Sequence, residues 1–352
     1  MIRLRQPPAF WWQAESRGKR PILSFALAPL GLLYGAIAGW RMRRSGFKAA
    51  LPVICVGNLV VGGAGKTPLA LALAKRLIVA GETPWFLSRG YGSAAEHGAP
   101  LIVDPSLHCA RDVGDEALLL ARVAPTLVSA DRAASARLAA EHGASVLVLD
   151  DGLQNPALEK DLKLIVVDAG AGIGNGRCLP AGPLRAPLSD QLDFASALVL
   201  VGEGAPAAGL IEAARRAGKP VVSAQLAVTS AMAAQLAHRR VYAFAGIGRP
   251  NKFFATLDEL GAEIVGTASF PDHYAYRRAD IATLQRAARE RDALLVTTEK
   301  DFVRLSLSAN GPAMVDPVLP VPLAVPIEMT VSDPAELDAL IARVLRRARG
   351  KS

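Results

Sequence analysis

A glycine-rich stretch that ends in lysine and threonine, GNLVVGGAGKTP over residues 57–68, has the spacing of a phosphate-binding loop. Backbone N–H groups at a helix N-terminus can cradle phosphate, and glycine lets the backbone approach it closely. Lys66 would place a positive charge against the β- and γ-phosphates of a nucleotide, and the Thr67 hydroxyl could bind Mg²⁺. A strand before the loop and a helix after it argue against a chance glycine-rich turn. The residues expected to contact the nucleotide are Gly62, Gly63, Ala64, Gly65, Lys66, Thr67 and Pro68.

One position departs from the usual loop. Val60 stands where the first glycine is expected. We interpret this as a variant loop geometry in which the doubled Gly62-Gly63 lies closer to the phosphates.

A second chemical feature is the acidic pair Asp150-Asp151, which follows the apolar run 146–149. A phosphate-binding loop is typically completed by an acidic residue at a strand end that holds Mg²⁺ directly or through water. Two adjacent carboxylates are costly unless a cation or donor is near. The metal ligands are therefore expected to be Thr67 with Asp150 or Asp151, and which carboxylate binds directly stays open. The alternative is a solvated acidic pair in a loop.

These residues need a scaffold of buried strands, and short apolar runs alternate with amphipathic stretches after residue 50. Near-continuous apolar runs are typical of parallel strands covered on both faces. The alternation predicts an α/β fold with a doubly wound sheet of the P-loop NTPase type. The expected strands are 52–56, 84–87, 126–128, 146–150, 164–168 and 198–201, and the expected helices are 66–79, 115–123, 133–141 and 210–217.

A second, smaller α/β domain is expected after a boundary in 225–240. Its strands are predicted at 241–245, 263–270 and 293–297 and its helices at 251–260 and 278–291, with the proline-rich stretch 312–326 as a connection. The domain bounds are therefore 1–48 for an N-terminal membrane-associated helix region, 49–225 for the kinase domain, 226–333 for the second α/β domain with its linkers and 334–352 for a C-terminal helix.

The N-terminal region contains twenty residues without charge, 21–40, flanked by arginines and lysines. A bilayer-spanning helix needs about 20 apolar residues, so a membrane anchor, spanning or deeply embedded, is favoured. A cleavable signal and a buried or interfacial helix are the alternatives. Pro29 should kink any helix here. Gly31, Gly35 and Gly39 share one face, which either packs against a partner or, as slightly preferred, has none.

The amino-acid composition limits the classes of ligand that the protein is expected to bind. A net charge of +8 favours acidic ligands, but aromatic residues make up only 5 % and basic runs are short, which argues against a nucleic-acid module. The basic charge instead favours a membrane surface or a phosphorylated ligand, and a mean hydropathy of +0.26 is high for a wholly soluble protein. Three widely spaced cysteines predict neither a disulfide framework nor a zinc site.

Eight stretches in order resemble one family, the lipid A 4′-kinases, that is, the tetraacyldisaccharide 4′-kinases of Gram-negative bacteria. They are GNLVVGGAGKTP (57–68), LSRGYG (87–92), VGDEALLLA (113–121), DDGLQN (150–155), GNGRCLPAGPLR (174–185), FAGIGRPNKFF (244–254), FPDHY (270–274) and TTEKDFVRL (297–305). Members of the family also lack the first glycine of the usual loop.

The resemblance implies ATP, Mg²⁺ and phosphoryl transfer to the 4′-hydroxyl of a tetraacylated glucosamine disaccharide 1-phosphate. It implies an enzyme of the bacterial inner membrane with its catalytic domains on the cytoplasmic side and its active site between two domains. Protein partners are not predicted.

The resemblance also assigns catalytic roles. It points to Asp115 as the base, paired with His273, and to Lys66 on the phosphates. A first-turn helix acid and a structural histidine are the alternatives for the pair. Arg185 would neutralise phosphate charge or bind substrate, unless it forms a surface salt bridge. The role of Arg89 is less certain. The run 299–301 is either a set of interdomain or nucleotide contacts or a solvated charged turn.

Two positions depart from the family pattern: Asn155 replaces the usual histidine, and Ala186 replaces the usual glutamate. Any metal or hydrogen-bonding role at these positions is in doubt. Two rival functions remain. The signature lysine of a phosphate-loop switch ATPase would stand at Val61, which argues against that class. Lys66, Thr67 and the aspartate pair argue against an inactive scaffold.

Overall fold

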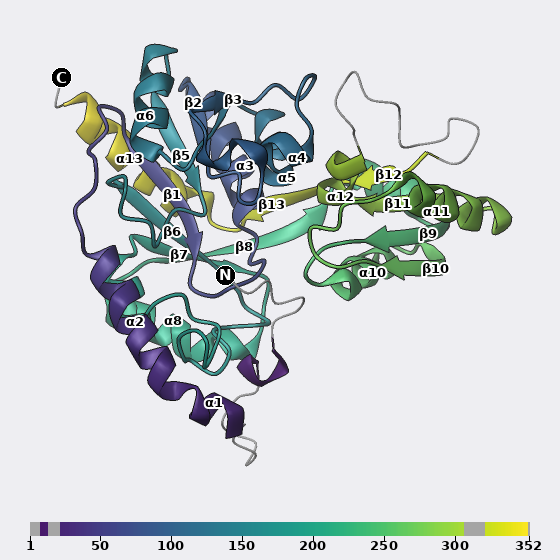
Figure 1. The fold of residues 1–352 in the computed structure, drawn as a ribbon, viewed down its shortest axis with the longest axis horizontal. Helices are drawn as coiled ribbons and strands as arrows, with labels where there is room; N and C mark the ends of the chain where they lie inside the picture. The colour runs from purple at the N-terminus through teal and green to yellow at the C-terminus, as the bar shows by residue number, and fades with distance from the viewer. Residues whose placement is uncertain (1–7, 13–21, 306–320, 351–352) are drawn as a thin grey trace.

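A computed structural model describes residues 8–12, 22–305 and 321–350. Its larger unit is a nine-stranded sheet in the order β13-β8-β7-β6-β1-β5-β2-β4-β3 (Figure 1). All pairings are parallel except those at the two ends, β3 with β4 and β13 with β8. The strands are β1 (Val53–Asn58), β2 (Pro84–Ser88), β3 (Leu101–Ile102), β4 (Thr126–Val128), β5 (Val146–Asp150), β6 (Leu162–Asp168), β7 (Ala197–Val201), β8 (Val221–Val228) and β13 (Ile327–Val331).

Helices cover both faces of this sheet. α3, α5 and α13 pack on one face, and α2, α6, α7 and α8 pack on the other. The central strands β1, β2 and β5 are buried along their whole length, as their continuous apolar sequences predict. The bounds are α2 (Ala28–Met42), α3 (Lys66–Val79), α4 (Ala110–Val113), α5 (Asp115–Ala121), α6 (Arg132–Glu141), α7 (Leu188–Phe194), α8 (Ala208–Arg216), α9 (Ser230–Leu236) and α13 (Pro334–Arg349), with short 3₁₀ turns η1 (Ala9–Trp11), η3 (Ala94–His97) and η4 (Ala205–Ala207).

The smaller unit is a four-stranded parallel sheet in the order β10-β9-β11-β12. α10 packs on one face of it and α11 on the other. α12 follows β11 and packs against α5 of the large unit, so it lies at the junction of the two units (Figure 1). The bounds are β9 (Arg240–Ala245), β10 (Glu263–Ser269), β11 (Leu294–Thr298), β12 (Leu323–Val325), α10 (Pro250–Glu259), α11 (Arg278–Glu290) and α12 (Glu299–Leu305).

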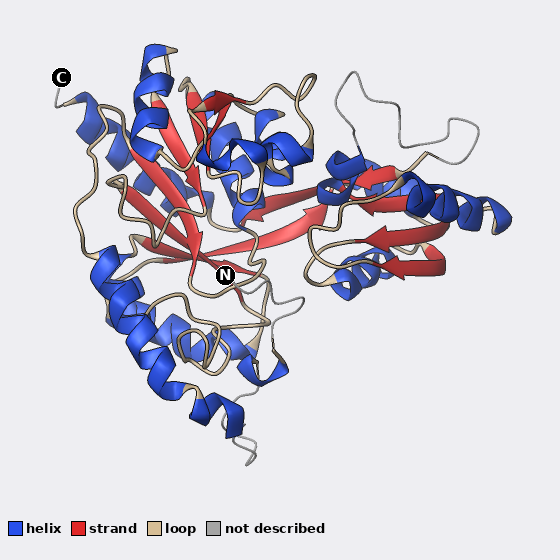
Figure 2. Ribbon diagram, viewed as in Figure 1, coloured by secondary structure: helices blue, strands red, loops and turns tan. Residues whose placement is uncertain are grey.

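The two units are joined by β8 and β13, which reach from the large sheet toward the small one (Figure 2). This corrects the expected domain bounds. β8 continues to Val228, and β13 returns to the large sheet, although both segments overlap the range 226–333 expected for the second domain. The expected proline-rich connection lies mostly outside the described residues, and its last part includes β12.

The N-terminal region folds into α1 (Ile22–Ala26) and α2, which run along one edge of the large unit (Figure 1, purple). The helix breaks at Leu27, two residues before Pro29, as the proline predicts. Within the described part of the chain no helix is both long and apolar enough to cross a bilayer. The flanking basic residues at 17–20 and Pro21 lie outside the described residues.

The glycine face of α2 has a partner, so the preferred expectation of an unpartnered face was wrong. Gly31, Gly35 and Gly39 are buried. A Cβ added at these positions would lie 2.0–3.0 Å from Cys178 or Asp190. The glycines therefore let α2 approach the segment 178–190 closely.

Candidate active site

The glycine loop follows β1 and leads directly into α3. Gly65 caps the helix with a φ of 93°, and Gly62 has a φ of 123°. Residues other than glycine rarely adopt these backbone angles, which explains why glycine occupies positions 62 and 65. Asn58, buried at the end of β1, donates from Nδ2 to the Gly62 carbonyl at 3.0 Å. The loop is thus held with its exposed Gly62 and Gly63 in front of the N-terminus of α3.

The structure explains why valine and not glycine stands at position 60. It forms an isolated antiparallel bridge with Leu184, and its carbonyl accepts from Nε of Arg185 at 3.2 Å. Its backbone is extended and its side chain is buried, so glycine offers no advantage there. The first half of the loop is therefore tied to the segment that carries Arg185.

The two carboxylates after β5 have different environments. Asp150 is buried, and its Oδ2 accepts from the Thr67 hydroxyl at 2.9 Å. Its Oδ1 is buried without a hydrogen-bond partner among the described residues. Burial, together with the negative charges of Glu116 and Asp151, raises the pKa of Asp150 to about 7, against the opposing effect of Lys66.

This arrangement fits a magnesium ion. A threonine hydroxyl beside a carboxylate with a free buried oxygen is a hard oxygen-donor pair, which Mg²⁺ prefers. The raised pKa of Asp150 results from burial and from neighbouring negative charges, and a divalent cation would offset both. Thr67 and Asp150 are the residues that would hold the ion.

Asp151 lies next to two cations. Its carboxylate accepts from Nη1 of Arg185 at 2.8 Å, and Nζ of Lys66 lies 3.6 Å away. Burial would raise its pKa, but Arg185 and Lys66 outweigh burial and lower it to about 2. Its φ of 56° is unusual for a residue with a side chain. Lys66, Asp151 and Arg185 therefore form one charged cluster at the mouth of the loop.

Asp115 and His273 meet across the junction of the two units. Nδ1 of His273 lies 3.1 Å from Oδ2 of Asp115, although the residues are 158 positions apart. Asp115 is the first residue of α5 and is buried, whereas His273 is half exposed. His273 also has a φ of 56°. Such conformations cluster at functional sites because the surrounding structure must enforce them.

Arg304 completes this pair and was missed from the sequence as an individual residue. Its Nε donates to Oδ2 of Asp115 at 2.7 Å, and its Nη2 contacts the same oxygen. Its Nη1 donates to the Gly246 carbonyl at 2.7 Å and to Asp301 at 2.8 Å. Arg304 is nine-tenths buried. In the sequence, Arg304 appears only as part of the family stretch 297–305. It was not singled out because an arginine in a charged helical run is usually solvated.

The electrostatics of Asp115 follow from these contacts. Burial disfavours its charged form, but the hydrogen bond from His273 and the charges of Lys300 and Arg304 outweigh burial and hold the pKa of Asp115 far below its usual range. Oδ2 is occupied by Arg304 and His273. Among the described residues, Oδ1 accepts only from the backbone N–H of Glu116, at 2.9 Å. The Oδ1 atom of Asp115 can therefore accept a further hydrogen bond.

The expected charged turn at 299–301 is the N-terminal turn of α12. Lys300 pairs with Glu116 of α5 at 3.1 Å and lies 3.4 Å from Nε2 of His273. Asp301 is fully buried and accepts from Arg304, from the Tyr276 hydroxyl and from the Gly246 N–H. Lys300 therefore makes an interdomain contact, whereas Asp301 joins segments of the second unit.

Three other residues discussed in the sequence analysis make local contacts outside these two clusters. Arg89 pairs with Glu96 of its own loop at 2.7 Å. Ala186 is buried, and its carbonyl accepts from Gln191 at 2.7 Å. Asn155 accepts from the Ala157 N–H at 2.9 Å and caps its own turn.

Comparisons with known proteins identify the family of the chain. A family model described as Tetraacyldisaccharide-1-P 4′-kinase matches residues 23–346. Among curated proteins, a tetraacyldisaccharide 4′-kinase of Methylobacterium sp. (strain 4-46) is 52 % identical over 97 % of this chain and 99 % of its own length. One from Bradyrhizobium sp. (strain BTAi1) is 48 % identical over 97 % of this chain and 96 % of its own.

A solved structure is also similar. The crystal structure of LpxK from Aquifex aeolicus in complex with ATP has a TM-score of 0.69 and 28 % identity, and the match covers 92 % of this chain and 99 % of that one. The α/β class with a large, mostly parallel sheet is therefore confirmed. The chain belongs to the tetraacyldisaccharide 4′-kinase family.

Proposed function

We propose that this protein transfers the γ-phosphate of ATP to the 4′-hydroxyl of a tetraacylated glucosamine disaccharide 1-phosphate, with Asp115 as the proton acceptor. The observation that carries the assignment of Asp115 is its contact with His273 and Arg304 across the domain junction. Glu116, the next residue, is one of the charges that raise the pKa of Asp150. The interdomain cluster and the loop site are therefore close enough to act on one substrate.

The loop residues would bind the nucleotide as a phosphate-binding loop does. The backbone N–H groups of residues 62–67 at the N-terminus of α3 offer donors to phosphate oxygens. Lys66, held by Asp151 at 3.6 Å, would move to the more highly charged phosphates. Mg²⁺, held by Thr67 and Asp150, would neutralise charge on the phosphates. Arg185 would stabilise charge that develops during transfer.

Asp115 would accept the proton of the attacking hydroxyl at Oδ1, the oxygen that is not taken by Arg304 or His273. Its low pKa makes it a weak base, so its main effect is to hold the hydroxyl in line and to take the proton late. That suits phosphoryl transfer, in which positioning and charge neutralisation dominate. With its proton on Nδ1, His273 would donate to Asp115 and present Nε2 to Lys300.

The second unit would supply His273 and Arg304, and the large sheet with β13 and α13 would form the kinase domain. Because the base is completed only when α12 rests on α5, the contact between the domains would control the reaction.

The N-terminal helices would lie in one leaflet of the bacterial inner membrane, with the catalytic units on the cytoplasmic side. The face of α1 and α2 opposite the buried glycines carries large exposed apolar side chains, which is typical of an interfacial helix. They are Ile22, Leu23, Phe25, Leu30, Leu32, Leu33, Ile37 and Trp40. Retention of the protein in membranes at high salt, with release by detergent, is expected. Release by salt alone would contradict this placement.

The function is tested with purified protein, γ-labelled ATP, Mg²⁺ and the acylated disaccharide 1-phosphate. Label should appear in the lipid. ATP hydrolysis without labelled lipid would favour the switch ATPase and overturn the kinase proposal. ATP binding without either reaction would favour a scaffold.

A further inference from the structure

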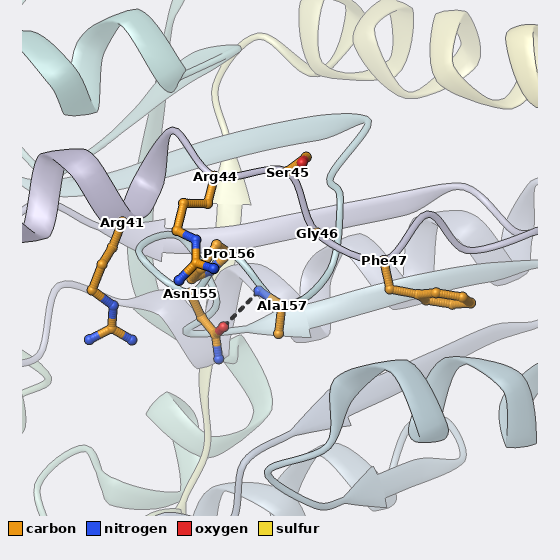
Figure 3. Close-up of a pocket in the computed structure, with 8 residues that line it drawn as sticks. All are labelled: Arg41, Arg44, Ser45, Gly46, Phe47, Asn155, Pro156 and Ala157. Carbon is orange, nitrogen blue, oxygen red and sulfur yellow. Dashed lines mark hydrogen bonds between the residues drawn. The ribbon is translucent and has the colours of Figure 1, made fainter.

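A cavity of about 450 Å³ opens at the C-terminal end of α2. It is lined by Arg41, Arg44 and the chain that follows to Phe47 on one side, and by the turn that starts at Asn155 on the other (Figure 3). The site described above does not use these residues.

The cavity presents hydrogen-bond donors without matching acids. In the described part of the chain, neither Arg41 nor Arg44 pairs with a carboxylate, whereas the neighbouring Arg43 pairs with Asp190. Asn155 accepts the Ala157 N–H with its Oδ1, and within the described residues its Nδ2 donates to no other group (Figure 3). Two guanidinium groups with an amide donor are a typical set for a phosphate group.

The cavity is connected to the catalytic residues. Asn155 follows Asp151 by four residues, so their Cα atoms are at most about 14 Å apart. Tyr34, half-buried on α2, feels the positive charges of both Arg185 and Arg41, which oppose the rise in its pKa caused by burial. α2 therefore runs from the charged cluster at the loop to the cavity.

The cavity also lies at the level expected for lipid head groups. Trp40, 60 % exposed, ends the apolar face of α2, and the Arg44 guanidinium stacks over its ring at 5.2 Å. Tryptophan and arginine together are typical of the membrane–water interface.

We propose that this cavity binds the phosphate monoester at the far end of the lipid acceptor, the end opposite the hydroxyl that is phosphorylated. The proposal rests on the proposed function and adds to it the residues that select a phosphorylated sugar. Arg41, Arg44 and Asn155 would hold this phosphate while the other sugar reaches Asp115.

The test compares two lipid acceptors, one with the 1-phosphate and one without it, in micelles of uncharged detergent. In the double variant Arg41→Gln/Arg44→Gln, KM for the phosphorylated acceptor should rise about tenfold or more, with kcat near wild type. KM for the acceptor without the phosphate should not change. Arg43→Gln, which removes a neighbouring charge that is already paired, is the matched control and should leave both KM values unchanged. Equal thermal midpoints establish that the variants fold.

Three results overturn the proposal. Equal effects on the two acceptors mean that the cavity does not recognise the 1-phosphate. An equal effect of Arg43→Gln means that general surface charge is responsible. An effect that appears only in vesicles of anionic phospholipid, and not in micelles, means that the cavity binds bulk head groups. If the wild-type protein labels neither acceptor, the proposed function itself fails, which is a separate outcome.

Discussion

Asp150 and Asp115 are both buried carboxylates near the N-terminus of a helix, yet their pKa values shift in opposite directions. Asp150 has one neutral donor, Thr67, and an oxygen without a partner, and its pKa rises to about 7. Asp115 has a histidine, an arginine and a lysine around it, and its pKa falls far below its usual range. Lys66 acts on Asp150 but does not outweigh burial and the neighbouring negative charges, whereas the cations around Asp115 do outweigh its burial.

The difference indicates how each site is completed. Asp150 belongs to one unit and needs a ligand from solution, for which Mg²⁺ is the fitting candidate. Asp115 is completed by residues of the second unit, so its state depends on the domain contact. The following variants change one site or the other.

The largest effect is expected for Asp115→Asn. It keeps the shape of the side chain but removes the proton acceptor, and kcat should fall by about 10²–10⁴-fold. The Kd for ATP should stay near wild type because Asp115 does not contact the nucleotide in our proposal. Single-turnover labelling and equilibrium ATP binding measure the two quantities. A kcat close to wild type would remove Asp115 from its proposed role.

Arg304→Met should come next. Breaking a buried ion pair by removing one partner destabilises a protein by about 3–5 kcal/mol. Loss of the arginine should also raise the pKa of Asp115. The ion pair stabilises the fold above the unfolded carboxyl pKa of about 3.9, and this stabilisation is lost as the pH falls toward the depressed folded value. In the variant, the acidic limb of kcat against pH should therefore move to higher pH.

Arg304→Lys is the control for this prediction. It keeps the charge but loses the two-pronged geometry. Its stability and its acidic limb should lie between those of the wild type and Arg304→Met. An unchanged pH profile in a folded Arg304→Met protein would show that Arg304 has only a structural role.

His273→Asn should have a smaller effect on activity, because Arg304 and Lys300 still surround Asp115. The histidine is half exposed, so stability should change little. We expect kcat to fall about tenfold and the acidic limb of kcat against pH to move slightly to higher pH. Steady-state kinetics against pH measure both changes. A loss as large as that of Asp115→Asn would instead make His273 the primary base.

The last prediction concerns the stability of Asp150→Asn and not the catalytic rate. A raised carboxyl pKa means that the folded state of the wild type binds the proton more tightly, so its stability should fall as pH rises from about 4 to 7. The variant removes this slope, and at pH 8 without metal its Tm should be higher than that of the wild type. Added Mg²⁺ should raise the wild-type Tm and leave that of Asp150→Asn nearly unchanged.

Asp338→Asn, which removes an exposed carboxylate, is the control for that experiment. Its pH dependence should match the wild type. A wild-type Tm that is flat between pH 4 and 7 without metal would contradict the raised pKa.

The glycine-loop site was predicted well from the sequence, because the features that define it are short and local in the chain. The strand 146–150 and the helix 66–79 have the expected bounds, and the glycines lie next to the residues they serve. Apolar runs and a helix start are set by neighbouring residues. Opposite pKa shifts for adjacent aspartates were not foreseen, because they depend on Arg185, Lys66 and Glu116 from distant segments.

The interdomain side was predicted less completely. Asp115 and His273 were paired only through a family resemblance, and the structure brings them together. Arg304 was not singled out, since its burial arises only when α12 packs on α5. β13 was not expected as a strand of the large sheet for a similar reason: its pairing with β8 joins segments about 100 residues apart. Periodicity along the chain carries no information on such long-range partners.

The most direct test measures the single-turnover rate of label transfer from ATP to the lipid as Mg²⁺ is raised, for the wild type, Asp150→Asn and Asp115→Asn. Asp150→Asn should need more Mg²⁺ and recover part of its rate at high concentration, because its defect is in a cation site. Asp115→Asn should stay at least about 100-fold below the wild type at every Mg²⁺ concentration. Recovery of Asp115→Asn by Mg²⁺, or transfer by it at the wild-type rate, would contradict the assignment of the interdomain carboxylate as the proton acceptor.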